Sequence, residues 1–155
     1  EGIPEEEILR YAKEQRPKVI IMGTRGKSQK DIDLIGSVTA EIIDRSRTAV
    51  LAIPENTPFK EFNEVKRIAF LTNFDQRDLI AFEAFFNTWK SFHFSVSLIH
   101  LAESKDTWNE IKLAGIKDYF QKQYPGLEIH YDVVMNDNLL KGLDQYIKDN
   151  QIDIL

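Results

Sequence analysis

A glycine-rich stretch is the feature of this chain whose residue types point to chemistry. GTRGKSQKDIDLIGS, residues 23–37, holds three of the seven glycines and follows directly on the apolar run Val19–Met22. Glycine loses more backbone entropy on folding than other residues, so such a cluster suggests that the backbone approaches something closely. A loop of this kind between a buried strand and a helix can direct backbone N–H groups and the positive end of the helix dipole at a phosphate. The stretch is therefore a candidate phosphate-binding loop.

Two common phosphate-binding motifs do not fit the stretch. The dinucleotide motif G-x-G-x-x-G is absent, and no acidic residue stands at the expected place on a following strand. GKS at residues 26–28 resembles the end of a P-loop, but Ile21 stands where that motif needs its first glycine. The spacing that is present is G-x2-G-x9-G-S, with its last two residues at a predicted helix start.

The elements that flank the loop follow from the hydrophobic pattern. Pro4 and the three glutamates after it favour the start of a helix. Val19–Met22 and Ala49–Ile53 are continuous apolar runs, which is typical of strands covered on both faces in a parallel sheet. Ser37 is a suitable N-cap for the helix between these strands. The first part of the chain is therefore predicted to be a helix followed by a β-loop-α-β unit.

The second part of the chain repeats the alternation of strands and helices. The polar stretch 54–64, which contains two prolines, precedes it, and we interpret residues 55–64 as a linker. Strands are predicted at 67–72, 94–101 and 127–134, and helices at 77–90, 108–119 and 139–149, before the final IDIL. The third of these strands alternates apolar and polar residues, which favours a sheet edge. In the helix at 77–90, we expect Ile80, Ala84 and Trp89 to face inward. In the helix at 108–119, Trp108, Ile111, Gly115 and Tyr119 follow helical spacing.

The two ends of the chain resemble each other. Ile8–Ile20 aligns without gaps with Leu143–Leu155 at an offset of 135 residues, with tyrosine at 11 and 146 and lysine at 13 and 148. A period of this length corresponds to a whole domain. We therefore expect a piece of a tandem protein, beginning late in one copy of the domain and ending late in the next.

The spacing G-x2-G-x9-G-S resembles the motif of the universal stress proteins, which lies between the fourth strand and the fourth helix of a five-stranded domain. MGTRGKSQKDIDLIGSVTAEIIDRSRTAVLAIPE is similar to that region, KRIAFLTNFD to the first strand, and SLIHLAE to the second. The resemblance implies an α/β fold with an open, mostly parallel sheet of order 3-2-1-4-5, similar to the adenine nucleotide alpha hydrolases, with helices on both faces. Residues 1–54 would be the C-terminal half of a first such domain, and residues 65–155 the N-terminal part of a second.

The resemblance also implies binding of ATP or another adenine nucleotide, with magnesium expected only if ATP binds. In the family, the glycine loop and its hydroxyl take the phosphates and ribose, and an aspartate after the first strand takes the adenine side. The positions of this chain that match the site are Gly23, Thr24, Arg25, Gly26, Lys27, Gly36, Ser37, Val38 and Asn73. Asn73 stands in place of the aspartate and offers a donor as well as an acceptor, so the adenine contact is expected to be weaker or altered.

The order of the strands leaves the assembly open between a permuted domain and a domain-swapped dimer. The chain supplies strands 4 and 5 before strands 1, 2 and 3, which together would complete one sheet. In either assembly we expect the two halves to share a sheet, with Val50 or Leu51 beside Ile68 or Phe70. The family also dimerises through its fifth strand, which predicts a homodimer through Ala49, Val50, Leu51, Ala52 and Ile53.

Composition excludes several classes of function. The chain has 155 residues, 43% of them hydrophobic, and a formal net charge of −5, so it has no general basic field for nucleic acid or a membrane surface. It has no cysteine and only three scattered histidines, a poor set for a metal site. Its apolar runs are shorter than the roughly 20 residues that span a bilayer. We expect a soluble, cytoplasmic protein with no nucleic-acid, membrane or resident metal partner.

Three functions remain in competition. The first is a nucleotide-binding regulatory protein of the stress response, and the second is a dimerisation scaffold that binds no nucleotide. The third is a slow ATP hydrolase. The sequence has no nucleophile, base and orienting group at motif spacing, so no catalytic residue is assigned. Other candidates have structural explanations: the glycines could form a simple turn, His100 a satisfied core histidine, and His93 and His130 surface residues.

Overall fold

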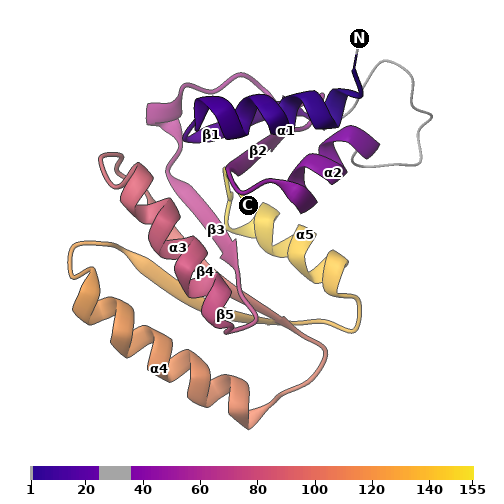
Figure 1. Ribbon diagram of the computed structural model, residues 1–155. Coiled ribbons are helices and arrows are strands. Elements are labelled where there is room, and N and C mark those ends of the chain that lie inside the picture. Colours follow the sequence, from indigo (N-terminus) through magenta and orange to yellow (C-terminus); the bar gives the residue numbers. More distant parts are fainter. Residues whose placement is uncertain (1, 25–35) are drawn as a thin grey trace. The chain divides into compact units, whose positions relative to one another are not determined.

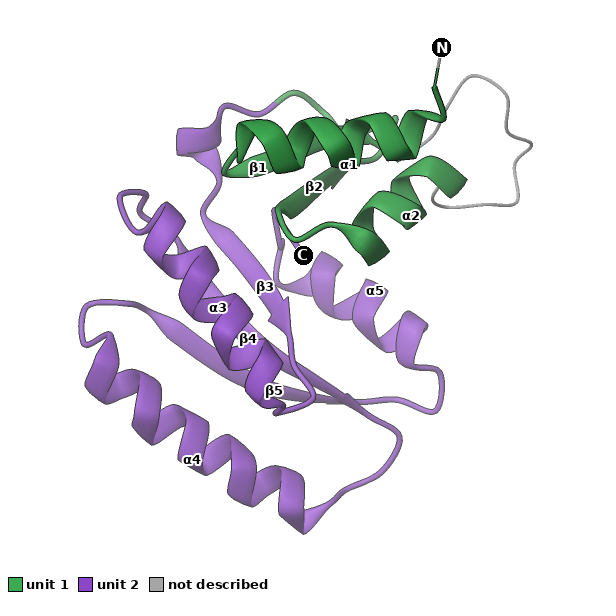
Figure 2. Ribbon diagram, viewed as in Figure 1, with its two compact units in different colours: residues 1–59 green, residues 60–155 purple. Residues whose placement is uncertain are grey.

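The computed structural model describes residues 2–24 and 36–155 and divides the chain into two compact units, residues 1–59 and 60–155 (Figure 2). Unit 1 contains α1 (Pro4–Gln15), β1 (Val19–Gly23), α2 (Ser37–Arg45) and β2 (Ala49–Ile53) (Figure 1). Unit 2 contains η1 (Phe62–Glu64), β3 (Arg67–Leu71), α3 (Gln76–Trp89), β4 (Ser95–Ala102), α4 (Thr107–Gln123), β5 (Ile129–Met135) and α5 (Leu139–Asp149). Within the described ranges, no helix is long and apolar enough to cross a membrane.

Unit 1 is built on the parallel pair of strands β1 and β2. Val19 lies opposite Ala49, and the register continues to Gly23 opposite Ile53. Ala12 of α1 and Ile42 of α2 are buried, and the two helices contact each other. The expectation that these strands are covered on both faces is wrong, because Ile21 is 61% exposed and Ile53 is 38% exposed. The helices of this unit bury one face of the short sheet and leave apolar side chains of the other in contact with solvent.

Unit 2 is a parallel sheet of order β3-β4-β5 with helices on both faces. β5 lies at an edge of this sheet, as its alternating pattern predicts. Ile129 and Tyr131 of β5 pack against the core formed with α3 and α4. Because successive side chains of a strand point to opposite faces, Asp132 points the other way, where its carboxylate accepts a hydrogen bond from Tyr146 of α5 at 2.5 Å.

The core of unit 2 is aromatic. Phe82 and Phe120 are each 1% exposed, and their ring centroids lie 4.5 Å apart. The expectation that Ile80, Ala84 and Trp89 of α3 face inward is wrong for two of these three residues. Ile80 is 59% exposed and Ala84 is also exposed, whereas Phe82 carries the burial and Trp89 packs against the core. In α4 the four residues that helical spacing relates are all exposed to solvent: Trp108, Ile111, Gly115 and Tyr119.

The expectation of one sheet shared by both halves is wrong for the described residues. The strands form two sheets, β1-β2 in unit 1 and β3-β4-β5 in unit 2. The place beside Ile68 is taken by Ile154 of the same unit, which bridges it in parallel and accepts a hydrogen bond from Ala69 N at 2.8 Å. The final IDIL segment therefore supplies the neighbour of β3 that we expected from residues 49–53.

The similarity between the two ends of the chain extends to backbone conformation. Arg16 follows α1 with φ of 50°, and Gln151 follows α5 with φ of 49°. The two residues are separated by the same offset of 135 that aligns their sequences. Left-handed conformations are uncommon for residues other than glycine, so the coincidence supports a common helix-to-strand connection.

Candidate functional site

The described glycine-motif residues lie at the carboxyl end of β1 and the amino end of α2, within unit 1. Gly23 ends β1, and Gly36 immediately precedes α2. Ser37 and Val38 are the first two residues of that helix. Three positions of the predicted site, Arg25, Gly26 and Lys27, lie outside the described residues. The structure thus brings both ends of the predicted loop to one edge of the unit.

Hydrogen bonds fix the base of this loop. The Gly36 N–H donates to the Thr24 carbonyl at 2.6 Å, and the Thr24 N–H donates to the Ile53 carbonyl at 3.0 Å. The Thr39 hydroxyl donates to the Gly23 carbonyl at 2.9 Å. The two threonines are 7% and 4% exposed, so their backbone and hydroxyl groups hold the loop base from within the unit.

The amino end of α2 has no side-chain cap. Gly36 occupies the N-cap position, and the first turn contains no acidic residue. The predicted capping by Ser37 is wrong, because the helix begins at Ser37 itself and its hydroxyl makes no capping bond. In α5, by contrast, the Asn138 side chain accepts a hydrogen bond from Lys141 N at 3.0 Å. The first N–H groups of α2 are therefore free of side-chain acceptors among the described residues, an arrangement that suits an anion.

Asn73 belongs to unit 2, just beyond the carboxyl end of β3. Its side chain is exposed, whereas Thr72 before it is buried and donates its N–H to the Ile99 carbonyl of β4 at 2.9 Å. Phe74 after it has φ of 63°, in the left-handed region. The neighbours of Asn73 thus hold it at the end of the strand with its amide group in solvent.

Asp78 of α3 organises the turn that carries Asn73. Its Oδ2 accepts hydrogen bonds from Asn73 N at 2.8 Å, the Thr72 hydroxyl at 3.0 Å and Asp75 N at 3.3 Å. A carboxylate of the chain itself therefore accepts from these donors of the turn, and the Asn73 side chain remains exposed. Asp78 is not among the predicted site residues, although aspartates at 75 and 78 have the spacing of a capping box, which the structure shows at the start of α3.

His100 is a buried histidine with both ring nitrogens engaged. Its Nδ1 lies 2.9 Å from the Thr72 carbonyl and its Nε2 lies 2.9 Å from Asn109 Nδ2. A carbonyl only accepts, so Nδ1 carries the proton and Nε2 accepts from the amide of Asn109. The ring centroid lies 4.6 Å from that of Phe74. The prediction of a satisfied core histidine is confirmed, and His93 and His130 are exposed as predicted.

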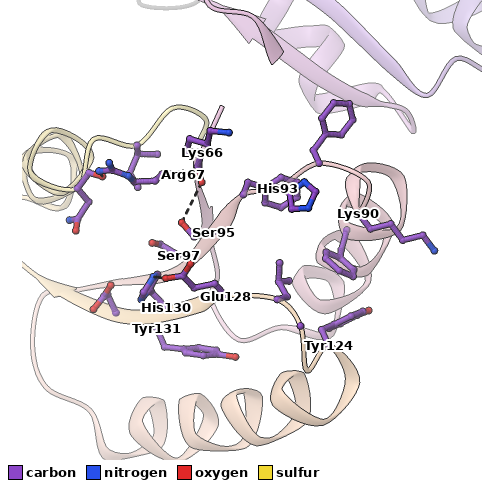
Figure 3. A pocket seen from close by; sticks show the side chains of 18 of the residues that line it. Lys66, Arg67, Lys90, His93, Ser95, Ser97, Tyr124, Glu128, His130 and Tyr131 are labelled. Atoms are coloured by element: carbon purple, nitrogen blue, oxygen red, sulfur yellow. Dashed lines mark hydrogen bonds and ion pairs between the residues drawn. The ribbon is translucent and has the colours of Figure 1, made fainter. Parts of the chain in front are cut away.

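A wide pocket of about 1220 Å³ lies at the opposite, amino end of the strands of unit 2 (Figure 3). Its lining mixes the cations of Lys66 and Arg67 with the acid of Glu128, which pairs with His130 at 3.1 Å. Burial raises the pKa of the Tyr131 phenol, whose hydroxyl has no hydrogen-bond partner among the described residues. The opposite charges compensate each other, so the lining forms no convergent catalytic set.

Comparisons with known proteins match the first part of the chain. The Universal stress protein family matches residues 1–54. Universal stress protein MJ0577 of Methanocaldococcus jannaschii is 42% identical over 52 residues, which are 34% of this chain and 32% of the relative. Universal stress protein MJ0531 of the same organism is 36% identical over 61 residues, 39% of this chain and 35% of the relative. Each match thus spans about a third of the length of the curated relative.

A solved structure matches the fold of nearly the whole chain. A universal stress protein from Archaeoglobus fulgidus DSM 4304 superposes with a TM-score of 0.75 over 99% of this chain and 55% of that chain, at 19% sequence identity. At this identity the likeness concerns the fold alone. Residues 1–54 therefore match the universal stress protein family, and the chain as a whole has the fold of a universal stress protein.

Proposed function

We propose that this protein is an ATP-binding regulatory protein of the stress response, and that the glycine loop takes the phosphates. The observation that carries the proposal is the uncapped amino end of α2, which stands at the end of the motif with Gly36 as N-cap and no acidic residue in its first turn. The helix dipole and the first backbone N–H groups favour a negative charge at this position. A bound triphosphate would satisfy those donors.

The residues of unit 1 fit such a ligand. The N–H groups of Ser37 and Val38 and the exposed Ser37 hydroxyl would bind phosphate oxygens, while Thr24 and Thr39 hold the loop base in place. Arg25 and Lys27 carry positive charge within the same motif. ATP would bring magnesium, which neutralises part of the phosphate charge. The proposal is one of binding and assigns no hydrolytic step.

Asn73 is the proposed adenine contact within unit 2, considered separately from the glycine loop of unit 1. Its amide is exposed at the end of β3, on a turn that Asp78 holds. An amide both donates and accepts, so it can pair with an adenine edge that offers both groups. We expect Asn73→Asp to change nucleotide preference and Asn73→Ala to weaken binding.

The experiment compares thermal melting of the full chain with and without ATP and magnesium. A ligand at 100 times its Kd stabilises the folded state by about 2.7 kcal/mol, which raises the melting temperature by several degrees. Gly36→Val should remove this shift, because a β-branched side chain at the N-cap crowds the loop base. Gly126→Ala is the matched control, since a Cβ at Gly126 would meet nothing within 4 Å. Absence of an ATP-dependent shift in the unmodified protein would reject the proposal.

A second candidate is a dimerisation scaffold that forms through β2. The observation that favours it is the exposure of Ile53 and Ile21 on the short sheet of unit 1. Apolar side chains on an exposed strand favour association with a second copy. Analytical ultracentrifugation of Ile53→Lys tests it: the unmodified protein should be dimeric without ATP and the variant monomeric, whereas a monomer in both cases removes this candidate.

A further inference from the structure

A basic pocket lies in unit 1 at the carboxyl ends of α1 and α2. It has a volume of about 500 Å³, and its lining consists of Leu9, Ala12, Lys13, Arg16, Arg45, Ser46, Arg47 and Thr48. Four of these residues are cationic and none of the described lining residues is acidic, although the whole chain carries a net charge of −5. Arg16 precedes β1 and Thr48 precedes β2, so the pocket is at the opposite end of the strands from the glycine loop. The two sites are therefore separate.

Most of the positive charge in this pocket has no carboxylate partner. Arg45 Nη1 lies 2.5 Å from Glu41 Oε1, which fixes its guanidinium and compensates its charge. Lys13, Arg16 and Arg47 form no ion pair with any residue that the structure describes. Cations near helix carboxyl ends are favoured by the helix dipole, which explains Lys13 and Arg45 in their last turns but not Arg47, which lies beyond α2.

The repeated helix-to-strand segment of unit 2 provides an internal comparison. At the offset of 135, Lys13 corresponds to Lys148, which pairs with Asp144 at 2.5 Å. The counterpart of Asp144 in unit 1 is Leu9, so Lys13 lacks the carboxylate that neutralises Lys148. The same segment therefore folds with a neutralised lysine in one unit and with a lysine open to an external anion in the other.

Arg16 shows the same contrast at a position with a demanding backbone. It follows α1 in the left-handed region, where glycine is the usual residue. Its counterpart Gln151 adopts nearly the same φ without a charge. The fold therefore requires neither an arginine nor a charge at this position, and the Arg16 guanidinium is left without a carboxylate partner among the described residues.

We propose that this basic pocket binds a phosphate-bearing small molecule at a site separate from the glycine loop. The guanidinium groups of Arg16 and Arg47 can each donate two parallel hydrogen bonds to phosphate oxygens, and the Lys13 ammonium adds a point charge. Ala12 is 8% exposed and forms an apolar part of the lining. The volume is within the range of about 300–1,000 Å³ that small-molecule sites occupy.

The test titrates pyrophosphate into the full chain by isothermal titration calorimetry at low ionic strength. Binding of one pyrophosphate is expected to persist in Gly36→Val, which lacks the proposed glycine-loop site, and to be weakened there at least tenfold by Arg16→Gln and by Arg47→Gln. Arg16→Gln should fold normally, because Gln151 holds the equivalent conformation, and its melting temperature verifies this. The controls are Arg10→Gln, on the same helix but paired with Glu7 and Glu14, and Lys148→Gln, the counterpart of Lys13. Both controls remove one positive charge and should bind within twofold of the unmodified protein.

Three results would overturn the proposal: no saturable binding, an equal loss in the two controls, or a complete loss of binding in Gly36→Val that Arg16→Gln does not reproduce. The last result would place the anion at the glycine loop. Failure of the proposed ATP site is distinguishable, because it would leave pyrophosphate binding and its dependence on Arg16 unchanged. If ATP competes with pyrophosphate for the Gly36→Val protein, the ligand of the basic pocket is a nucleotide. If pyrophosphate still binds and ATP does not compete with it, the ligand is a free phosphate compound.

Discussion

The carboxylate of Asp153 ties the segment after α5 to the beginning of β3, and its replacement by asparagine is a sharp test of that connection. Its Oδ2 accepts hydrogen bonds from Lys66 N at 2.8 Å and Arg67 N at 3.0 Å, and its Oδ1 pairs with Lys60 Nζ. The side chain is only 14% exposed. Asp153→Asn keeps the shape of the group and removes its charge.

The magnitude follows from the three bonds. The amide oxygen of asparagine can still accept from the two N–H groups, but the bonds become neutral, and the amide nitrogen can face the Lys60 ammonium in place of Oδ1. Hydrogen bonds to a charged group contribute about 1.5–3 kcal/mol, and neutral ones about 0.5–1.5 kcal/mol. We therefore expect the variant to lose about 1–3 kcal/mol of unfolding free energy at pH 7.

The same contact predicts a dependence on pH. Burial by itself raises the pKa of Asp153, but the hydrogen bonds from Lys60 and from the N–H groups of Lys66 and Arg67 outweigh it and leave this pKa below its usual value. The stabilisation is therefore present above the unfolded pKa of about 3.9 and is lost as the pH falls through the lower folded pKa. The difference in unfolding free energy between the unmodified protein and the Asp153→Asn variant should shrink as the pH is lowered from about 5 toward about 2.

Urea denaturation followed by tryptophan fluorescence measures this effect, because both tryptophans, Trp89 and Trp108, lie in unit 2. The control is Asp149→Asn, an exposed aspartate of α5 that accepts a hydrogen bond from Gln145. Its change should stay within about 0.5 kcal/mol. A loss below that value for Asp153→Asn at pH 7, or an equal loss at pH 7 and pH 3, would refute the reasoning.

Three further predictions concern the core and the two loop regions. Phe82→Ala, at a position 1% exposed, should lower the unfolding free energy by about 3–5 kcal/mol in urea denaturation, and a loss below about 2 kcal/mol would contradict its central place. Thr39→Val removes a buried donor at the loop base and should cost about 1 kcal/mol, with faster hydrogen exchange of the Gly36 amide; unchanged exchange would contradict the proposed bracing. Asp78→Ala leaves the Asn73 N–H without its acceptor and should cost about 1–3 kcal/mol, with faster exchange of that amide, whereas an unchanged exchange rate would show another acceptor.

The order and type of the elements could be predicted from sequence because apolar runs and their boundaries encode them locally. Val19–Met22 and Ala49–Ile53 carry the continuous pattern of a parallel sheet, and the structure pairs them in register. The facing of the helices could not be predicted in the same way. α3 has apolar residues around much of its circumference, so only packing against the sheet decides that Phe82 is buried and Ile80 exposed.

The site was predictable where its residues are adjacent in sequence and not where distant residues meet. The motif spacing indicated Gly23 and Gly36 as candidate site residues, but the role of Asp78 depends on the path that the chain takes after β3. The expected shared sheet was wrong for a related reason. Sequence pattern identifies a strand without identifying the edge that it joins, and Ile154 joins the edge of β3 that we had assigned to residues 49–53.

The hydrogen bond between Gly36 and Thr24 has a consequence for protein engineering. It joins the end of β1 directly to the start of α2, so the two elements are held together at the point where the connecting segment leaves and returns. The entropic cost of lengthening a closed loop grows only slowly with its length. We therefore expect residues inserted between Thr24 and Gly36 to cost little unfolding free energy, because this hydrogen bond holds the two elements together on either side of the insertion.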